Sequence, residues 1–458
     1  MVSRREVLKL SGATAISASL GAIAQDIAPA DYELDIAAVT LDVAPRRQVK
    51  TTGYNGQAPG PLLHLKEGRT VTIAVTNHTD HPEVVHWHGL FLPPAVDGAL
   101  EEGTPPIAPG TSARYTFTPA PAGFRWYHSH VMAMGDLTRG LYSGQHGPLM
   151  IEPRNNPGLY DQEFFLALQD WDGYLSASED GAMNPSYRVS TINGKALGSG
   201  EPLRVKQGAR VLLHVVNTSP TEPHWVALAG HELAVLALDG NPVPRPQRVR
   251  MLRLAPAERV CAAVEMNNPG IWILGEVRRH VQAAGMGLVV EYGGQHGAPR
   301  WQQPADLSWN YEQFATAVPI EAAATPAIAV PLVFESRFRG HGAMEAWTIN
   351  GKSYPDTSAA PLVSGQRYRL LFINKSRDDH PLHLHRHSFE LRSFGKSLDG
   401  SGTARVNNVG GIIKDVVLVD AQTQAEVEFV ADHPGATLFH CHQQSHMDQG
   451  FMLLFTYA

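Results

Sequence analysis

The chain has 458 residues, of which 43% are hydrophobic and 18% charged, and its formal net charge is −7 with 22 histidines counted as neutral. At about 150 residues per domain, this length predicts roughly three domains, each large enough to bury its own core. A net charge of −7 gives no indication of a nucleic-acid partner, because phosphate binding needs clustered Lys and Arg. Two cysteines exclude a disulfide framework, since Cys261 and Cys441 could form one bridge at most.

The first 24 residues have the pattern of an export signal. Two arginines, Arg4 and Arg5, precede a weakly apolar run that ends in the small-residue site Ala22-Ile23-Ala24. Paired arginines in this arrangement are typical of a twin-arginine signal peptide. The run is too short to span a bilayer, and no later run reaches 18 uninterrupted apolar residues. We therefore expect residues 1–24 to engage the twin-arginine export machinery, and the mature protein to be periplasmic or secreted, without a membrane span.

One strand pattern occurs three times along the chain. In each copy a Gly is followed nine residues later by an Asn, as in Gly68 and Asn77, Gly208 and Asn217, and Gly365 and Asn374. The residues between them alternate apolar and polar, which is typical of half-buried strands. Short strands, frequent Gly and Pro turns and no long amphipathic helix predict an all-β protein of three sandwiches in series. The predicted sandwiches are residues 30–153, 160–293 and 328–458, with residues 294–327 as a linker.

A glycine before the last strand of each copy shows which copies carry histidines. Five and seven residues after Gly123 and Gly435 the sequence has histidines, namely His128, His130, His440 and His442. The equivalent positions after Gly270 are Gly275 and Val277. We therefore interpret the middle copy as structural, without metal ligands.

Four segments contain histidines at alternate positions: His86-Trp87-His88, His128-Ser129-His130, His383-Leu384-His385 with His380 before it, and His440-Cys441-His442 with His446 after it. Residues i and i+2 leave a strand on the same face, so each pair can converge on one metal or on two adjacent ones. A single such pair is more typical of a solvated strand face, whereas four at equivalent ends of repeated units indicate metal sites. Imidazole suits Cu, Zn, Fe and Ni, and the Cys441 thiolate narrows the choice toward copper.

The last segment predicts two connected centres. Strand alternation sends His440 and His442 to one face and Cys441 to the other, toward His446 and His380. Two histidines and a thiolate with a weak axial neighbour describe a blue copper centre for electron transfer. Electrons that enter at Cys441 then have a short covalent path to the histidines on either side of it.

These four segments, in this order and across the mature chain, resemble the copper-binding motifs of bacterial three-domain multicopper oxidases, the laccase group in particular. The resemblance implies three consecutive cupredoxin-like Greek-key β-sandwich domains. It also implies four coppers per chain, with a trinuclear cluster between the first and third domains. By this resemblance His380, Cys441 and His446 hold the type 1 copper, and His86 and His383 hold the type 2 copper. The type 3 pair is then held by His88, His128, His130, His385, His440 and His442.

The axial position of the type 1 site departs from the pattern of many bacterial members, which have Met there. This chain has Phe451, which is similar to the Phe or Leu of high-potential laccases. A non-coordinating axial residue raises the reduction potential of the copper. Met452 is the alternative source of sulfur, although strand alternation turns it the other way.

Two acidic residues are candidates for delivering protons to the cluster. Asp97 resembles the family's carboxylate that orients a copper-bound water and relays protons. The alternative is a purely structural role, since Asp before a glycine, here Gly98, is common in turns. Met447 stands where bacterial relatives often place an acid. Its neighbour Asp448 is therefore either a substitute relay or a surface residue.

These observations predict a laccase-like multicopper oxidase that couples one-electron oxidation of phenols or aromatic amines to the four-electron reduction of O2 to water. Its predicted catalytic residues are Cys441, His440, His442 and Asp97. A periplasmic cuprous oxidase, which takes Cu(I) instead, uses the same coppers and is disfavoured by the lack of a methionine-rich insert. A non-catalytic copper-binding tolerance protein would not need the full set of ligands. Three repeats also disfavour a two-domain nitrite reductase.

Overall fold

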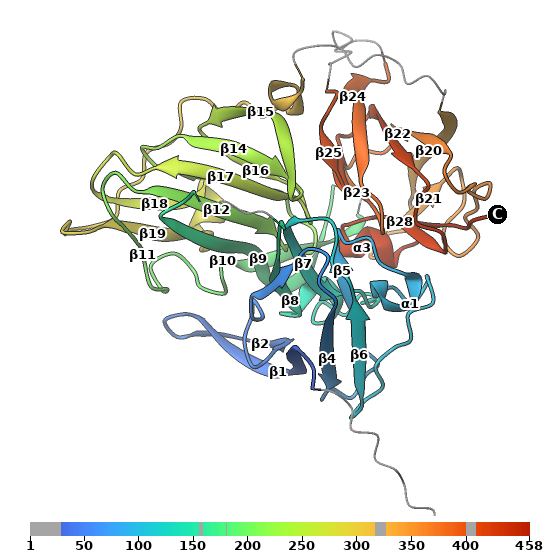
Figure 1. The fold of residues 1–458 in the computed structure, drawn as a ribbon, viewed down its shortest axis with the longest axis horizontal. Helices are drawn as coiled ribbons and strands as arrows, with labels where there is room; N and C mark the ends of the chain where they lie inside the picture. Colours follow the sequence, from blue (N-terminus) through green and yellow to red (C-terminus); the bar gives the residue numbers. More distant parts are fainter. Residues whose placement is uncertain (1–28, 155–158, 180, 317–326, 400–408) are drawn as a thin grey trace, which may run out of the picture.

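A computed structural model describes residues 29–154, 159–179, 181–316, 327–399 and 409–458, which form three two-sheet β-sandwiches in series (Figure 1). The predicted all-β class is confirmed, because the helices in this part of the chain are single turns. Figure 1 shows the first sandwich in blue and teal, the second in green and yellow, and the third in orange and red. The predicted signal peptide, residues 1–24, lies outside the described residues. None of the described helices is long and apolar enough to cross a membrane.

The first sandwich consists of two four-stranded sheets, in the orders β2-β1-β4-β6 and β3-β8-β7-β5. Its pairs are antiparallel except β1 with β4 and β3 with β8. The elements are β1 (Tyr32–Ala44), β2 (Arg47–Tyr54), β3 (Leu63–Lys66), β4 (Val71–Asn77), β5 (Val85–His88), α1 (Pro94–Asp97), β6 (Ser112–Phe117), β7 (Gly123–Ser129), the 3-10 turn η1 (Gly140–Tyr142) and β8 (His146–Glu152).

The second sandwich is larger, with a six-stranded sheet in the order β10-β9-β12-β17-β14-β15 and a five-stranded sheet in the order β11-β19-β18-β13-β16. Its elements are β9 (Gln162–Ala177), β10 (Met183–Ile192), β11 (Leu203–Val205), β12 (Arg210–Asn217), β13 (His224–Leu228), β14 (Leu233–Leu238), β15 (Asn241–Val249), β16 (Leu252–Leu254), β17 (Arg259–Glu265), β18 (Ile271–Glu276), α2 (Arg279–Ala283) and β19 (Gly287–Tyr292).

The third sandwich has a six-stranded sheet, β21-β20-β22-β27-β24-β25, and a four-stranded sheet, β26-β23-β28-β29. Its elements are β20 (Ile328–Arg337), β21 (Ala346–Ile349), β22 (Arg367–Asn374), β23 (His380–Leu384), β24 (Phe389–Ser397), β25 (Ile413–Lys414), β26 (Val416–Val419), β27 (Thr423–Val430), β28 (Thr437–Cys441), α3 (Gln444–Asp448) and β29 (Met452–Phe455). The described part of the predicted linker contains the 3-10 turn η2 (Tyr311–Phe314), which is anchored by the buried Tyr311 and Phe314.

The repeated strand pattern has a structural cause that all three sandwiches share. Each glycine of the pattern has a positive φ, between 74° and 81°, which a side chain would disfavour. Each asparagine is fully buried, and its side-chain amide donates to at least two backbone carbonyl oxygens, as Asn217 does to Glu222 and Leu254. The equivalent strands β4, β12 and β22 are therefore each preceded by a glycine with positive φ and end at a buried asparagine. Only two of the three sandwiches also carry paired histidines.

Candidate metal centre

The strands that carry the paired histidines lie in one sheet of the first sandwich and one of the third. In the first, β5 pairs with β7 so that His86 lies opposite His128. In the third, β23 pairs with β28 so that His383 lies opposite His440. Antiparallel pairing and side-chain alternation thus bring the histidines of each sandwich to one face.

A compact three-residue group forms around Cys441 at the end of β28. The Cys441 Sγ atom lies 3.7 Å from His380 Nδ1 and 3.5 Å from His446 Nδ1, and the two nitrogens are 3.2 Å apart. His380 comes from the start of β23 and His446 from α3. These three ligand atoms converge as the sequence predicts, and two imidazoles with one thiol are the donor set of a blue copper centre.

Aromatic side chains enclose this Cys441 group. The Phe451 ring is fully buried and lies 4.8 Å from the His380 ring, while Trp347 stands 4.1 Å from His446. Met452, the alternative sulfur source, packs instead with Ala99 and other residues of a separate apolar cluster. The structure therefore places Phe451, and not Met452, beside the ligands.

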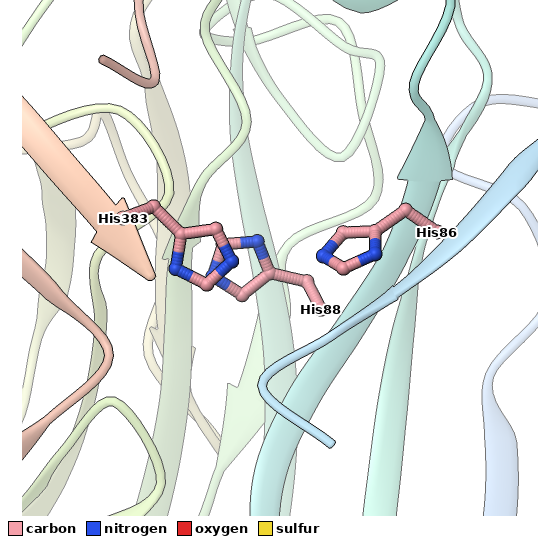
Figure 2. Close-up of side chains that lie close together, drawn as sticks. All are labelled: His86, His88 and His383. Carbon is pink, nitrogen blue, oxygen red and sulfur yellow. The ribbon is translucent and has the colours of Figure 1, made fainter. Parts of the chain in front are cut away.

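The other eight histidines form a second group, with four residues from the first sandwich and four from the third. Their ligand atoms fall into sets of three, namely His88, His128 and His442; His130, His385 and His440; and His86, His88 and His383. Figure 2 shows the last set, with the rings of His86, His88 and His383 facing one another across the two sandwiches. The first two sets divide the six predicted type 3 ligands into two threes.

Hydrogen bonds orient most of these rings through Nδ1. His86, His128, His383 and His440 each turn Nδ1 to a backbone carbonyl oxygen, at 2.7 to 2.9 Å. In the described part of the chain, no hydrogen-bonding partner reaches the buried Nε2 atoms of His86, His383 and His442. Buried nitrogens that converge without partners are costly unless an ion binds them. The eight-histidine group therefore fits metal ions, and its nitrogen donors suit copper.

Burial sets the charge of both groups. It lowers the pKa of His88, His383, His440 and His442 well below the ordinary value, and that of His446 to about 3. Neutral imidazoles have a lone pair free for a metal. Burial also raises the pKa of the Cys441 thiol, so its deprotonation requires a bound cation.

Asp97 lies at the end of α1 and touches two of the histidines. Its carboxylate Oδ2 is 3.0 Å from His385 Nδ1 and 3.2 Å from His86 Nδ1. It also faces Glu102, a residue that the sequence analysis did not select. Burial raises the pKa of Glu102 well above its ordinary value, and the neighbouring charge of Asp97 adds to this rise. The pair can therefore hold a proton beside the cluster.

Asp448 has a different environment from Asp97. It is only 6% exposed, so its interpretation as a surface residue is wrong. Its two oxygens accept from the backbone N–H groups of Ala133 and Met134, and one also accepts from Gln444 Nε2. Asp448 thus anchors the loop that follows His130.

A cavity of about 390 Å³ opens beside His446, between the second and third sandwiches. Its lining contains three acidic residues, Glu222, Asp378 and Asp379, and one basic residue, Arg377. Asp378 Oδ2 lies 4.0 Å from His446 Nε2. A small molecule in this cavity would lie against a ligand of the Cys441 group.

Comparison with known proteins gives a consistent result along the chain. Three family models, each described as multicopper oxidase, match residues 36–156, 162–287 and 330–458. Multicopper oxidase MmcO of Mycobacterium tuberculosis is 29% identical over 440 residues, which cover 88% of this chain and 82% of that protein. Laccase-4 of Thanatephorus cucumeris is 27% identical over 487 residues, which cover 90% of this chain and 86% of that one.

A solved structure shows the same arrangement of three sandwiches. The multi-copper oxidase of Pseudomonas thermotolerans superposes with a TM-score of 0.71 and 27% sequence identity, over 94% of this chain and all of that chain. The predicted cupredoxin-like fold is therefore confirmed.

Proposed function

The chain belongs to the multicopper oxidase family, whose members are copper-dependent oxidoreductases that use O2, and we propose that it acts as a laccase-like oxidase of phenols or aromatic amines. The observation that carries the proposal is the tripeptide His440-Cys441-His442. Its thiol belongs to one group of ligands, while its two imidazoles belong to the two sets of the other group. A protein that only stores copper does not transfer electrons between its metal sites, so it does not need a tripeptide that joins the two groups of ligands.

Four coppers per chain fit the donor sets, with one at the Cys441 group and three at the eight histidines. Bound there, copper supplies single-electron transfer from the donor to dioxygen. The chain's own residues keep water away from the ligands, because the eight histidines are at most 3% exposed. They also provide the strand that joins the groups.

The cavity beside His446 supports a phenolic or aromatic amine donor. Oxidation of a phenol releases a proton, and carboxylates such as Asp378 near His446 can accept it. Among the described residues that line this cavity, none is Met or Cys. Cu(I) prefers such soft sulfur ligands, so the lining does not favour a cuprous ion.

Asp97 is the proposed proton relay. Its carboxylate contacts His86 and His385. It also faces Glu102, whose pKa is raised well above its ordinary value by burial and by Asp97 itself, so Glu102 is a neighbour that can supply a proton. Reduction of O2 to water consumes four protons, so a buried acid at this position serves the reaction directly.

Oxygen uptake tests the proposal. The copper-loaded protein is compared with its Cys441→Ser variant, with a phenolic donor in one cell and Cu(I) in the other. We expect rapid uptake with the phenol, little with Cu(I), and none above background in the variant. The reverse preference would indicate a cuprous oxidase, and no uptake by a protein with four bound coppers would indicate a copper-binding protein.

We also propose export by the twin-arginine pathway to the periplasm or the exterior. The support is the sequence of residues 1–24, in which Arg4 and Arg5 precede a small-residue cleavage site. Replacing both arginines by Lys is expected to leave the protein in the cytoplasm, and cell fractionation with an antibody measures this. Unchanged export of the double variant would contradict the proposal.

A further inference from the structure

Two aspartates hold the eight-histidine group from opposite sides in the same way. The backbone carbonyl of Asp97 accepts from His86 Nδ1 at 2.8 Å, and its carboxylate lies 3.0 Å from His385 of the third sandwich. The backbone carbonyl of Asp415 accepts from His383 Nδ1 at 2.7 Å, and its carboxylate lies 3.2 Å from His88 of the first sandwich. Each aspartate thus contacts one histidine of its own sandwich through its main chain and one of the other sandwich through its carboxylate, and the carboxylate of Asp97 also lies 3.2 Å from His86 Nδ1.

The two sides differ in which ring atom the carboxylate engages. Asp97 contacts His385 through Nδ1, whereas Asp415 contacts His88 through Nε2. The His88 ring is therefore turned around, and its Nδ1 lies 3.4 Å from His128 Nε2, inside the ligand set that His442 completes. Each imidazole has one nitrogen for a metal, and the hydrogen bond at the other nitrogen decides which one it is.

Asp415 can only accept a hydrogen bond, because cations fix it as a carboxylate. Arg259 donates to both oxygens, from Nη1 to Oδ1 and from Nη2 to Oδ2, each at 2.6 Å. Arg125 Nη1 is 3.4 Å from Oδ2. All three side chains are fully buried. A two-point guanidinium contact of this kind holds a carboxylate in one orientation. His88 must then carry its proton on Nε2.

The residue that fixes Asp415 comes from the middle sandwich. Arg259 begins β17, and it is held in turn by the carbonyl oxygens of Ala257 and Asp239. The carboxylate of Asp239 also forms an ion pair with Lys414 Nζ, at 2.9 Å, and accepts from the backbone N–H of Asp415. The second sandwich, which lacks paired histidines, thus contacts Asp415 through the side chains of Arg259 and Asp239.

We propose that Asp415 is a positioning residue that keeps the His88 proton on Nε2 and so presents Nδ1 to the metal, and that Arg259 of the middle sandwich holds Asp415 in place for this purpose. This inference rests on the proposed copper cluster for its consequence, since the contact prepares one ligand set. Outer carboxylates that orient a ligand histidine are worth about 10- to 100-fold in metal affinity.

The tautomer of His88 in the metal-free wild-type protein tests the proposal directly. Nitrogen-15 NMR of histidine-labelled protein distinguishes the Nε2–H form from the Nδ1–H form, and the signal that disappears in His88→Gln identifies the residue. We expect the Nε2–H form for His88 and the Nδ1–H form for His86, His128, His383 and His440. An Nδ1–H form for His88 would overturn the proposal.

Copper binding to variants supplies the second readout. Asp415→Asn removes the anion, and Arg259→Lys keeps the positive charge but removes the two-point contact. We expect the affinity of one copper per chain to fall by about 10- to 100-fold in Asp415→Asn and by less in Arg259→Lys, with the His88 tautomer becoming mixed. If Asp415→Asn does not fold, Arg259→Lys and the wild-type tautomer still decide the question.

Asp170→Asn is the matched control. Asp170 is also a buried carboxylate paired with a buried histidine, since its Oδ2 lies 2.9 Å from His224 Nε2, but it touches no ligand. We expect this variant to be less stable and to keep its copper affinity and the His88 tautomer. An equal loss of copper in Asp170→Asn would assign the effect to stability and overturn the positioning role. Failure of oxygen uptake in the wild type would overturn the oxidase and leave the tautomer result standing.

Discussion

A buried histidine of the middle sandwich, His224, differs in charge from the buried paired histidines of a flanking sandwich, His440 and His442. In the middle, burial by itself lowers the pKa of His224, but Asp170 and Glu276 raise it to about 9, so this imidazole is cationic and ion-paired. In the outer sandwiches, burial lowers the pKa of His440 and His442 and leaves them neutral. In the same fold, a buried histidine that faces carboxylates is a cation that stabilises the core. A buried histidine that faces other histidines stays neutral and can bind a metal.

The comparison also shows what the middle sandwich retains. Its repeated strand ends on a buried asparagine like the others, and its Arg259 reaches Asp415 beside the ligands. Cys261, its one cysteine, is buried with its Sγ 3.0 Å from His214 Nδ1. The middle sandwich therefore contributes Arg259, which holds Asp415, and one wall of the cavity beside His446. The candidate metal ligands lie in the first and third sandwiches.

The largest effect is expected when a ligand histidine of the third sandwich is replaced by the residue at the equivalent position of the second sandwich. His442→Val places there the side chain that the middle copy has at the equivalent position, Val277. This removes one member of the set with His88 and His128. We expect oxygen uptake to fall to background, copper content to drop, and the blue absorption of the Cys441 group to remain. Loss of the blue colour as well would mean that the two groups are not separable.

Asp97→Asn is expected to have the next largest effect. The change keeps the size of the side chain but removes its charge at His86 and His385. Because Asp97 both orients ligands and relays protons in our proposal, oxygen uptake should fall by about 10- to 100-fold, with a larger fall at high pH, where protons are scarce. Glu102→Gln serves as the milder companion. Full activity of Asp97→Asn would leave Asp97 with only a turn role.

Much of this site could be predicted from the sequence because it depends on short-range geometry. Strand alternation alone places Cys441 opposite His440 and His442, and the His-x-His spacing identifies the converging pairs. The family resemblance then assigns each residue to a set, and the structure brings the same residues together. These inferences require neither the order of the sheets nor the packing of the sandwiches.

The supporting residues could not be predicted in the same way. Asp415, Arg259 and Glu102 act across sandwiches, and no local pattern records which distant residue a buried charge will meet. One signal was available, since Lys414 and Asp415 interrupt the apolar run from Ile412 to Val419. A buried charged pair in such a strand requires partners. The spacing of the histidines does not predict which ring nitrogen of His88 faces the other ligands.

His224→Gln sharpens the comparison from the structural side. It leaves the buried Asp170 without its cation, while Glu276 keeps its ion pair with Arg278. The free energy of unfolding should therefore fall by roughly 3 to 5 kcal/mol near pH 6. The raised pKa of about 9 means that the stabilisation is complete below the unfolded value of 6.5 and disappears as the pH rises through 9. The difference in melting temperature between wild type and variant should therefore shrink toward pH 10. Copper content should be unchanged, and a pH-independent difference would contradict the ion pair.

The smallest expected effect comes from Phe451, which adjusts the Cys441 group without belonging to it. Phe451→Met offers a weak axial sulfur 
where the wild type presents an apolar ring 4.8 Å from His380. A sulfur donor stabilises the oxidised copper, so the reduction potential should fall, and each 59 mV, roughly, is a tenfold change in the equilibrium with the donor. Redox titration of the blue absorption measures this, and oxidation of electron-poor phenols should slow first. Phe451→Leu is the control, because it changes the packing without supplying a ligand. An equal shift in both variants would assign the effect to packing and not to coordination.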